Sequence, residues 1–209
     1  MWAGPGTPSE PAPLPGPSLA AMSAAFSALA ATLADIAEAP GRHAKADRLG
    51  ALLADLDDAD LRRAARWAAG RVFPLSDQRA VRVGPSALRQ ATAAATGAPD
   101  DDLAAALVRL GDPGDVAAGA IEALVPPVAP TLSLADAEAF FAEVAATRGS
   151  TARTALVAAM LGRVTPVEAR FLVKLLVGEL RIGCWRAASR RAWPGSTGWR
   201  WATCSGAPC

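Results

Sequence analysis

The sequence contains no tyrosine, and aromatic residues make up only 5% of its 209 positions. Aromatic and β-branched side chains are the ones that strands favour, whereas the alanine that dominates this chain favours helices. The sequence also lacks any run of 18 apolar residues, so we expect no membrane span. Together these shortages predict an all-α fold.

Cysteine and histidine are scarce as well. The three cysteines, Cys184, Cys204 and Cys209, all follow residue 183, and the single histidine is His43. Such spacing indicates neither a zinc site nor a disulfide framework. We therefore expect no metal site, and a body suited to the reducing cytoplasm.

Neither sign of charge is in excess. The formal net charge is +1, and residues 22–183 hold 17 Lys and Arg against 19 Asp and Glu. A nucleic-acid role would therefore have to rest on local clusters of basic residues rather than on bulk charge. The length allows one good core or two small ones.

Residues 1–21 differ from the rest because they hold six Pro and three Gly and little apolar mass. They lack the basic segment and continuous apolar run of a secretory signal, so we expect a disordered leader. Met22 directly precedes the first periodic segment and is a candidate start of translation.

Apolar residues recur at helical spacing through residues 22–183, with helix-start and helix-stop residues between the periodic segments. The predicted helices cover about residues 23–38, 42–56, 61–70, 86–96, 103–110, 115–124, 133–147, 151–161 and 165–177. The rigid, proline-rich residues 125–130 divide them. We expect about ten helices in two packed halves.

The stretch from Thr165 to Gly183 carries the strongest local pattern. Thr165 with Glu168 forms a capping box, with proline at the first helical position. A wide apolar face follows, and Gly178 and Gly183 then interrupt and end the stretch. Glycine lets the backbone come close to a ligand, although a plain helix end and turn would also explain the pattern.

Two other places combine helix starts with basic residues. We expect Ser150 to cap a helix, and the free amides there, together with Arg153, suit a phosphate. Arg42 and Lys45 lie in the first turns of an earlier predicted helix. The alternatives are an ordinary helix cap at Ser150 and a solvated charged face around Arg42.

The order of these motifs resembles the N-terminal, DNA-binding domain of ATP-dependent DNA ligases over about residues 23–183. The landmarks are the helix from Phe26 to Ile36 with Gly41, Arg42 and Lys45; Gly70–Pro74; Val83-Gly84; Leu110–Asp112 with Asp115-Val116; Thr131-Leu132; Gly149–Thr151; and the Thr165–Gly183 stretch. Each motif is weak alone, but seven in one order are specific.

The resemblance implies a domain that grips nicked duplex DNA through its backbone, independently of base sequence. It implies phosphate contacts at eight positions. These are Arg42, Lys45, Ser150, Arg153, Lys174, Gly178, Arg181 and Gly183. It also implies a bacterial protein associated with the nucleoid, with nick sealing in repair, recombination and replication as the activity of the intact enzyme.

Catalysis in that family needs a lysine in a KxDG motif of a following domain, together with ATP and Mg²⁺. This chain has two lysines, and Lys45 is followed by Ala46, Asp47 and Arg48, with arginine where the motif requires glycine. We therefore expect no catalytic residue and no cofactor in this chain. A separately encoded catalytic half is a possible partner.

Residues 184–209 depart from the family, which continues there as a helix with acidic and apolar residues. They hold four of the six Trp, all three Cys and four Arg, but no acid. A two-base shift of the Trp codons restores a Leu-Glu-Gly pattern, so we expect a frameshift near Gly183 and an aberrant, disordered tail. A helical protein-interaction module and a non-functional ligase remnant stay open as alternatives.

Overall fold

The computed structural model describes residues 24–81 and 83–180, and it confirms the all-α class. In these residues the chain forms nine α-helices and no strand. The helices are α1 (Phe26–Glu38), α2 (Arg42–Ala54), α3 (Asp58–Ala68), α4 (Pro85–Thr96), α5 (Asp100–Leu110), α6 (Pro113–Leu124), α7 (Leu134–Ala146), α8 (Ser150–Leu161) and α9 (Pro166–Val177). The leader at 1–21 and the tail at 184–209 lie outside the described residues.

Helix starts follow the local sequence signals at most positions. The Thr165 side chain accepts from the amide of Glu168, whose carboxylate accepts from the amide of Thr165, so the predicted capping box is confirmed. Asp112 caps α6 in the same way by accepting from two amides. The cap predicted at Ser150 is wrong, because Gly149 occupies the cap position with φ +87° and Ser150 is the first helical residue.

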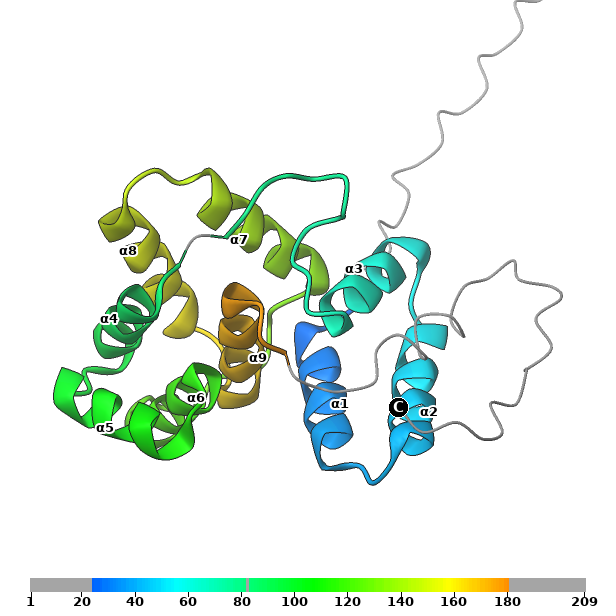
Figure 1. The fold of residues 1–209 in the computed structure, drawn as a ribbon, viewed down its shortest axis with the longest axis horizontal. Helices are drawn as coiled ribbons and strands as arrows, with labels where there is room; N and C mark the ends of the chain where they lie inside the picture. Colours follow the sequence, from blue (N-terminus) through cyan, green and yellow to red (C-terminus); the bar gives the residue numbers. More distant parts are fainter. Residues whose placement is uncertain (1–23, 82, 181–209) are drawn as a thin grey trace, which may run out of the picture.

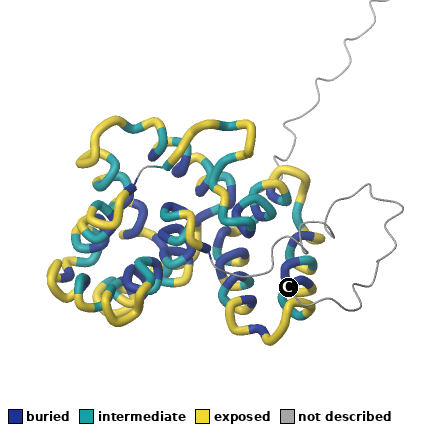
Figure 2. Tube along the Cα trace, in the orientation of Figure 1, coloured by how far each residue is buried: buried dark blue, intermediate teal, exposed yellow. Residues whose placement is uncertain are grey.

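The core is built around Trp67 of α3, which is fully buried. Its ring meets Phe26 of α1 edge-on at 5.8 Å and Phe141 of α7 at 5.6 Å, which is the geometry that aromatic pairs prefer. Figure 2 shows the buried faces of the helices turned towards the middle of the molecule. Three segments far apart in sequence therefore share one core.

Helix α9 lies in the middle of the molecule, with α1 to α3 on one side and α4 to α6 and α8 on the other (Figure 1). The halves before and after residues 125–130 pack against each other, since α6 lies on α9, α4 on α8 and α3 on α7. The segment before α1 also pairs with the segment before α7, where Phe26 N donates to Leu132 O at 2.8 Å. The two halves thus form one body.

Within the described part of the chain, no helix is long and apolar enough to cross a membrane. The same residues contain no group of three or more His, Cys, Asp or Glu side chains placed to hold a metal ion.

Candidate functional site

A groove of about 360 Å³ lies where the loop after α3 meets the C-terminal end of α9. Residues 70–75, 77, 79–81 and 175–178 line it, and we call it the α9 groove. A Cβ atom added on Gly70 would lie 3.8 Å from Leu180 Cβ and 3.9 Å from Gly178 O, so the two walls lie close together there. The fold thus brings together two of the sequence landmarks, Gly70–Pro74 and the end of α9.

The first wall is fixed to α3 by its backbone. Gly70 N donates to Trp67 O at 2.7 Å, and Arg71 N donates to Arg66 O at 3.1 Å. The Val72 carbonyl then accepts two side-chain bonds, from Arg66 Nε at 3.0 Å and from Trp67 Nε1 at 3.3 Å. Four hydrogen bonds over three consecutive residues leave this part of the loop little conformational freedom.

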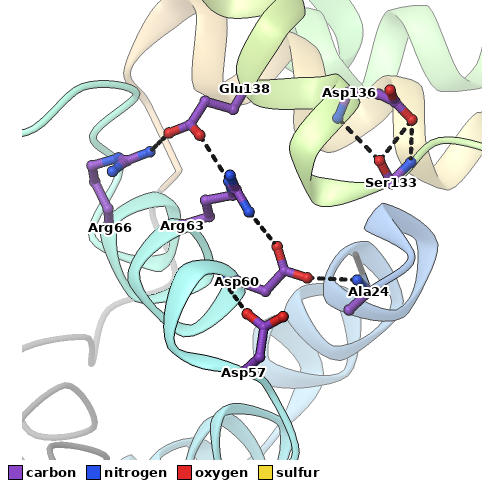
Figure 3. A network of polar contacts seen from close by, with 8 residues as sticks. All are labelled: Ala24, Asp57, Asp60, Arg63, Arg66, Ser133, Asp136 and Glu138. Carbon is purple, nitrogen blue, oxygen red and sulfur yellow. Dashed lines mark hydrogen bonds and ion pairs between the residues drawn. The ribbon is translucent and has the colours of Figure 1, made fainter. Parts of the chain in front are cut away.

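Arg66 is in turn held by an ion-pair network between α3 and α7 (Figure 3). Glu138 of α7 accepts from Arg66 Nη2 with one oxygen and from Arg63 Nε, at 2.8 Å, with the other. Arg63 Nη1 also donates to Asp60 at 2.7 Å, and Asp60 accepts from the amide of Ala24 at 2.6 Å. The network therefore links the groove loop to α7 and to the start of α1.

Opposing effects act on the pKa of Glu138. Burial raises it, but the hydrogen bonds and charges of Arg63 and Arg66 lower it more, so the pKa of Glu138 lies below its usual value. Glu138 therefore stays charged at neutral pH, and both arginines keep an anionic partner.

Three charged residues line the groove: Asp77 and Arg79, which pair with each other, and Arg71. Arg79 forms a two-oxygen ion pair with Asp77, with Nη2 at 2.6 Å from Oδ2 and Nε at 3.1 Å from Oδ1, and its guanidinium lies over the Phe73 ring at 4.5 Å. The hydrogen bonds from Arg79 hold the pKa of Asp77 below its usual value. Arg71 is exposed, and its side chain has no hydrogen bond or ion pair with any described residue.

The second wall ends at Gly178, the C-cap of α9. Its φ of +77° is in the left-handed region that favours glycine, and a Cβ atom there would meet no atom of the described residues within 4 Å. The backbone at this point is therefore open to a close approach from outside. Arg181 and Gly183, the other predicted contacts of this turn, lie outside the described residues.

Lys174 points away from this groove and contacts α6. Its Nζ donates to Asp112 Oδ2 at 2.7 Å and lies 3.6 Å from Asp115 Oδ1, and 15% of its side chain is exposed. Burial raises the pKa of Asp112, but the hydrogen bond and charge of Lys174 outweigh burial and lower it. The Lys174 charge thus serves the contact between α6 and α9.

The other predicted residues lie at two separate helix starts. Ser150 is exposed at the start of α8, where no side chain caps the first-turn amides, and Arg153 Nε donates to Thr147 O at 3.0 Å. Arg42 is exposed at the start of α2, which also lacks a side-chain cap, and Lys45 Nζ reaches Ala37 O at 3.5 Å. Helices α2 and α8 lie on opposite sides of the molecule (Figure 1).

Among the described candidates, therefore, only Gly178 lines the α9 groove. Sequence reasoning missed Arg71 and Arg79 as groove residues. A signal was present, because Gly70–Pro74 was already one of the landmarks, but nothing local indicated that this loop would meet the end of α9.

Comparison with known proteins gives a consistent result. A family model described as DNA ligase N terminus matches residues 25–193. A probable DNA ligase of Koribacter versatilis is 37% identical over 114 residues, covering 54% of this chain and 20% of that protein. A DNA ligase of Natronomonas pharaonis is 32% identical over 180 residues, covering 80% of this chain and 33% of that protein. The chain thus spans a third or less of these relatives.

Proposed function

The chain belongs to the family of DNA ligase N-terminal domains, and from this membership we propose that it binds duplex DNA at nicks, independently of base sequence. The observation that carries the proposal is the family match over residues 25–193. In this proposal the chain is the DNA-binding portion of an ATP-dependent ligase system for repair, recombination and replication. It acts at the bacterial nucleoid in the cytoplasm.

The proposed contacts are to phosphates, because phosphate contacts position a protein on DNA without reading its sequence. The open backbone at Gly178, followed by Arg181 and Gly183, supplies the first set. The uncapped amides at the start of α8 with Ser150 and Arg153, and those at the start of α2 with Arg42 and Lys45, supply further sets.

Lys174 is left out of the proposed contacts. Its ammonium group would have to leave Asp112 and Asp115 to reach a phosphate, and one partly buried carboxylate would then lose its partner.

We propose that this chain does not seal nicks by itself. Transfer of AMP in the ligase family needs a lysine in a KxDG context, and neither Lys45 nor Lys174 has one. A separately encoded catalytic half would supply that lysine and bind ATP and Mg²⁺. The expected result is that the 209-residue chain gains no label from ATP carrying a radioactive α-phosphate.

The test of DNA binding uses the full chain and fluorescently labelled duplexes of scrambled sequence, either nicked or intact. We expect the anisotropy to rise on binding, with an affinity that does not depend on sequence and that falls as salt increases. Arg181→Ala should weaken binding, whereas Arg109→Ala, which removes an exposed charge from α5, should not.

Two other outcomes would point elsewhere. If a folded sample binds neither duplex at low salt, DNA binding by this chain is wrong, and a protein-interaction module or a non-functional ligase remnant becomes the better description. Specific capture of a protein by the chain would favour the module. Helical-repeat modules show self-similarity at a fixed period, which the chain lacks.

A further inference from the structure

We propose that Arg71 is a DNA phosphate contact in the α9 groove, and that Arg66 and Glu138 are positioning residues that hold its backbone in place. This inference rests on the proposed function and adds to it a cation that is not among the eight contacts predicted from the sequence. The ligand class is the sugar-phosphate backbone of duplex DNA.

The charge available in the α9 groove is that of Arg71. Arg71 is exposed, and its guanidinium has no partner among residues 24–81 and 83–180. The other charged residues lining the groove are Arg79 and Asp77, which neutralise each other. The lining therefore carries one uncompensated positive charge, and no unpaired carboxylate of the lining repels a phosphate.

Open backbone lies in the same groove as the Arg71 charge. Arg71 and Gly178 line the same groove, one with a guanidinium and the other with an open backbone. A DNA strand that passes Gly178 closely would thus bring its phosphates towards Arg71. Guanidinium groups suit phosphate oxygens because they can donate two parallel hydrogen bonds.

The loop that carries Arg71 is held in place by hydrogen bonds to α3. The backbone of Arg71 and that of the next residue are bonded to α3, through Arg71 N to Arg66 O and through Arg66 Nε to Val72 O. Arg66 is fixed by Glu138, which also binds Arg63. A loop that is already ordered loses less conformational entropy on binding, so this clamp should increase the affinity that Arg71 contributes.

Glu138 is the residue whose substitution tests this clamp. It lies on α7 and does not line the groove, and its hydrogen-bonded link to the backbone at Arg71 runs through Arg66. Any effect of Glu138 on DNA affinity should therefore depend on the presence of the Arg71 side chain.

The experiment measures nicked-duplex binding by the full chain over a range of salt concentrations. Arg71→Ala should weaken binding roughly tenfold at low salt, the effect of one charged hydrogen-bonding contact. It should also reduce the slope of log K against log salt by about 0.9, the value for one lost phosphate contact. Arg109→Ala is the matched control, since it removes the same side chain from an exposed site on α5 and should change neither quantity.

Glu138→Gln is then measured in the wild-type and Arg71→Ala backgrounds. It should weaken DNA binding roughly threefold with Arg71 present and leave it unchanged without Arg71, which is the coupling expected of a positioning residue. Arg66→Lys keeps the charge but cannot reproduce the Nε bond to Val72, so it should behave in the same way. Thermal unfolding shows that each variant is folded at the assay temperature.

The outcomes separate the two proposals. If the wild type does not bind DNA, both fail. If the wild type binds and Arg71→Ala matches Arg109→Ala, the proposed function stands and this inference is wrong. Equal losses from Glu138→Gln and Arg66→Lys in the two backgrounds would leave these residues a purely structural role and overturn the positioning part.

Discussion

The contact between α6 and α9 should tolerate no side chain at Gly114. A Cβ atom there would lie 2.5 Å from Arg170 O and 2.8 Å from Lys174 Cγ, so the backbones of the two helices would have to separate. Overpacking of this kind costs about 1–3 kcal/mol. Gly119 lies on the same helix with nothing within 4 Å of its Cβ position, and alanine there should stabilise the helix by about 0.5–1 kcal/mol.

The two substitutions make the same chemical change on one helix, so their comparison isolates the packing effect. We expect Gly114→Ala to lower the free energy of unfolding and Gly119→Ala to raise it, with a difference of about 1–3 kcal/mol, the cost of the overpacking alone. Urea unfolding followed by circular dichroism measures both. Equal stabilities, or a Gly114→Ala variant more stable than wild type, would refute the close packing of α6 on α9.

Two further predictions concern charge and capping. The pKa of Asp112 is lowered in the folded protein, so its charged form stabilises the fold. This contribution to the free energy of unfolding is complete above the usual aspartate pKa of 3.8 and is lost as pH falls through the lower native pKa. The difference in unfolding free energy between wild type and Asp112→Asn should therefore shrink at acid pH in pH-dependent urea titrations, and a constant difference would contradict the ion pair. Thr165→Ala should lower the free energy of unfolding by about 1–2 kcal/mol, because it removes two hydrogen bonds with the fully buried Glu168. Ser133→Ala, in an exposed capping box, should lower it by about 0.5–1 kcal/mol. Thermal unfolding of both variants would contradict this ranking if the exposed box cost more.

The helices and most of their starts could be predicted because their signals are local. A capping box needs residues three apart, so Thr165 and Glu168 indicate the start of α9 without knowledge of any other helix. The error at Ser150 is local too. Glycine before the serine can adopt the positive φ needed to enter the helix, which moves the cap one residue earlier and leaves the hydroxyl as the first helical side chain.

The candidate site was harder to predict because its geometry depends on contacts between distant residues. Lys174 follows a helix pattern typical of an exposed cation, yet its partner Asp112 lies 62 residues earlier in the chain. Arg66 and Glu138 are 72 residues apart. A sequence shows which side chains carry charge, but only the packing of α6 on α9 and of α3 on α7 decides which charges meet.

Bulk charge is therefore a poor guide to the surface on which this domain could bind DNA. Seven cations of the described residues form ion pairs within the fold: Arg62, Arg63, Arg66, Arg79, Arg89, Arg170 and Lys174. These pairs remove cations and acids in equal numbers, so the bulk charge balance does not show where on the surface a cation is left without a partner. What matters is where a cation that has no partner among the described residues lies beside open backbone, and Arg71 and Gly178 meet that condition in one groove.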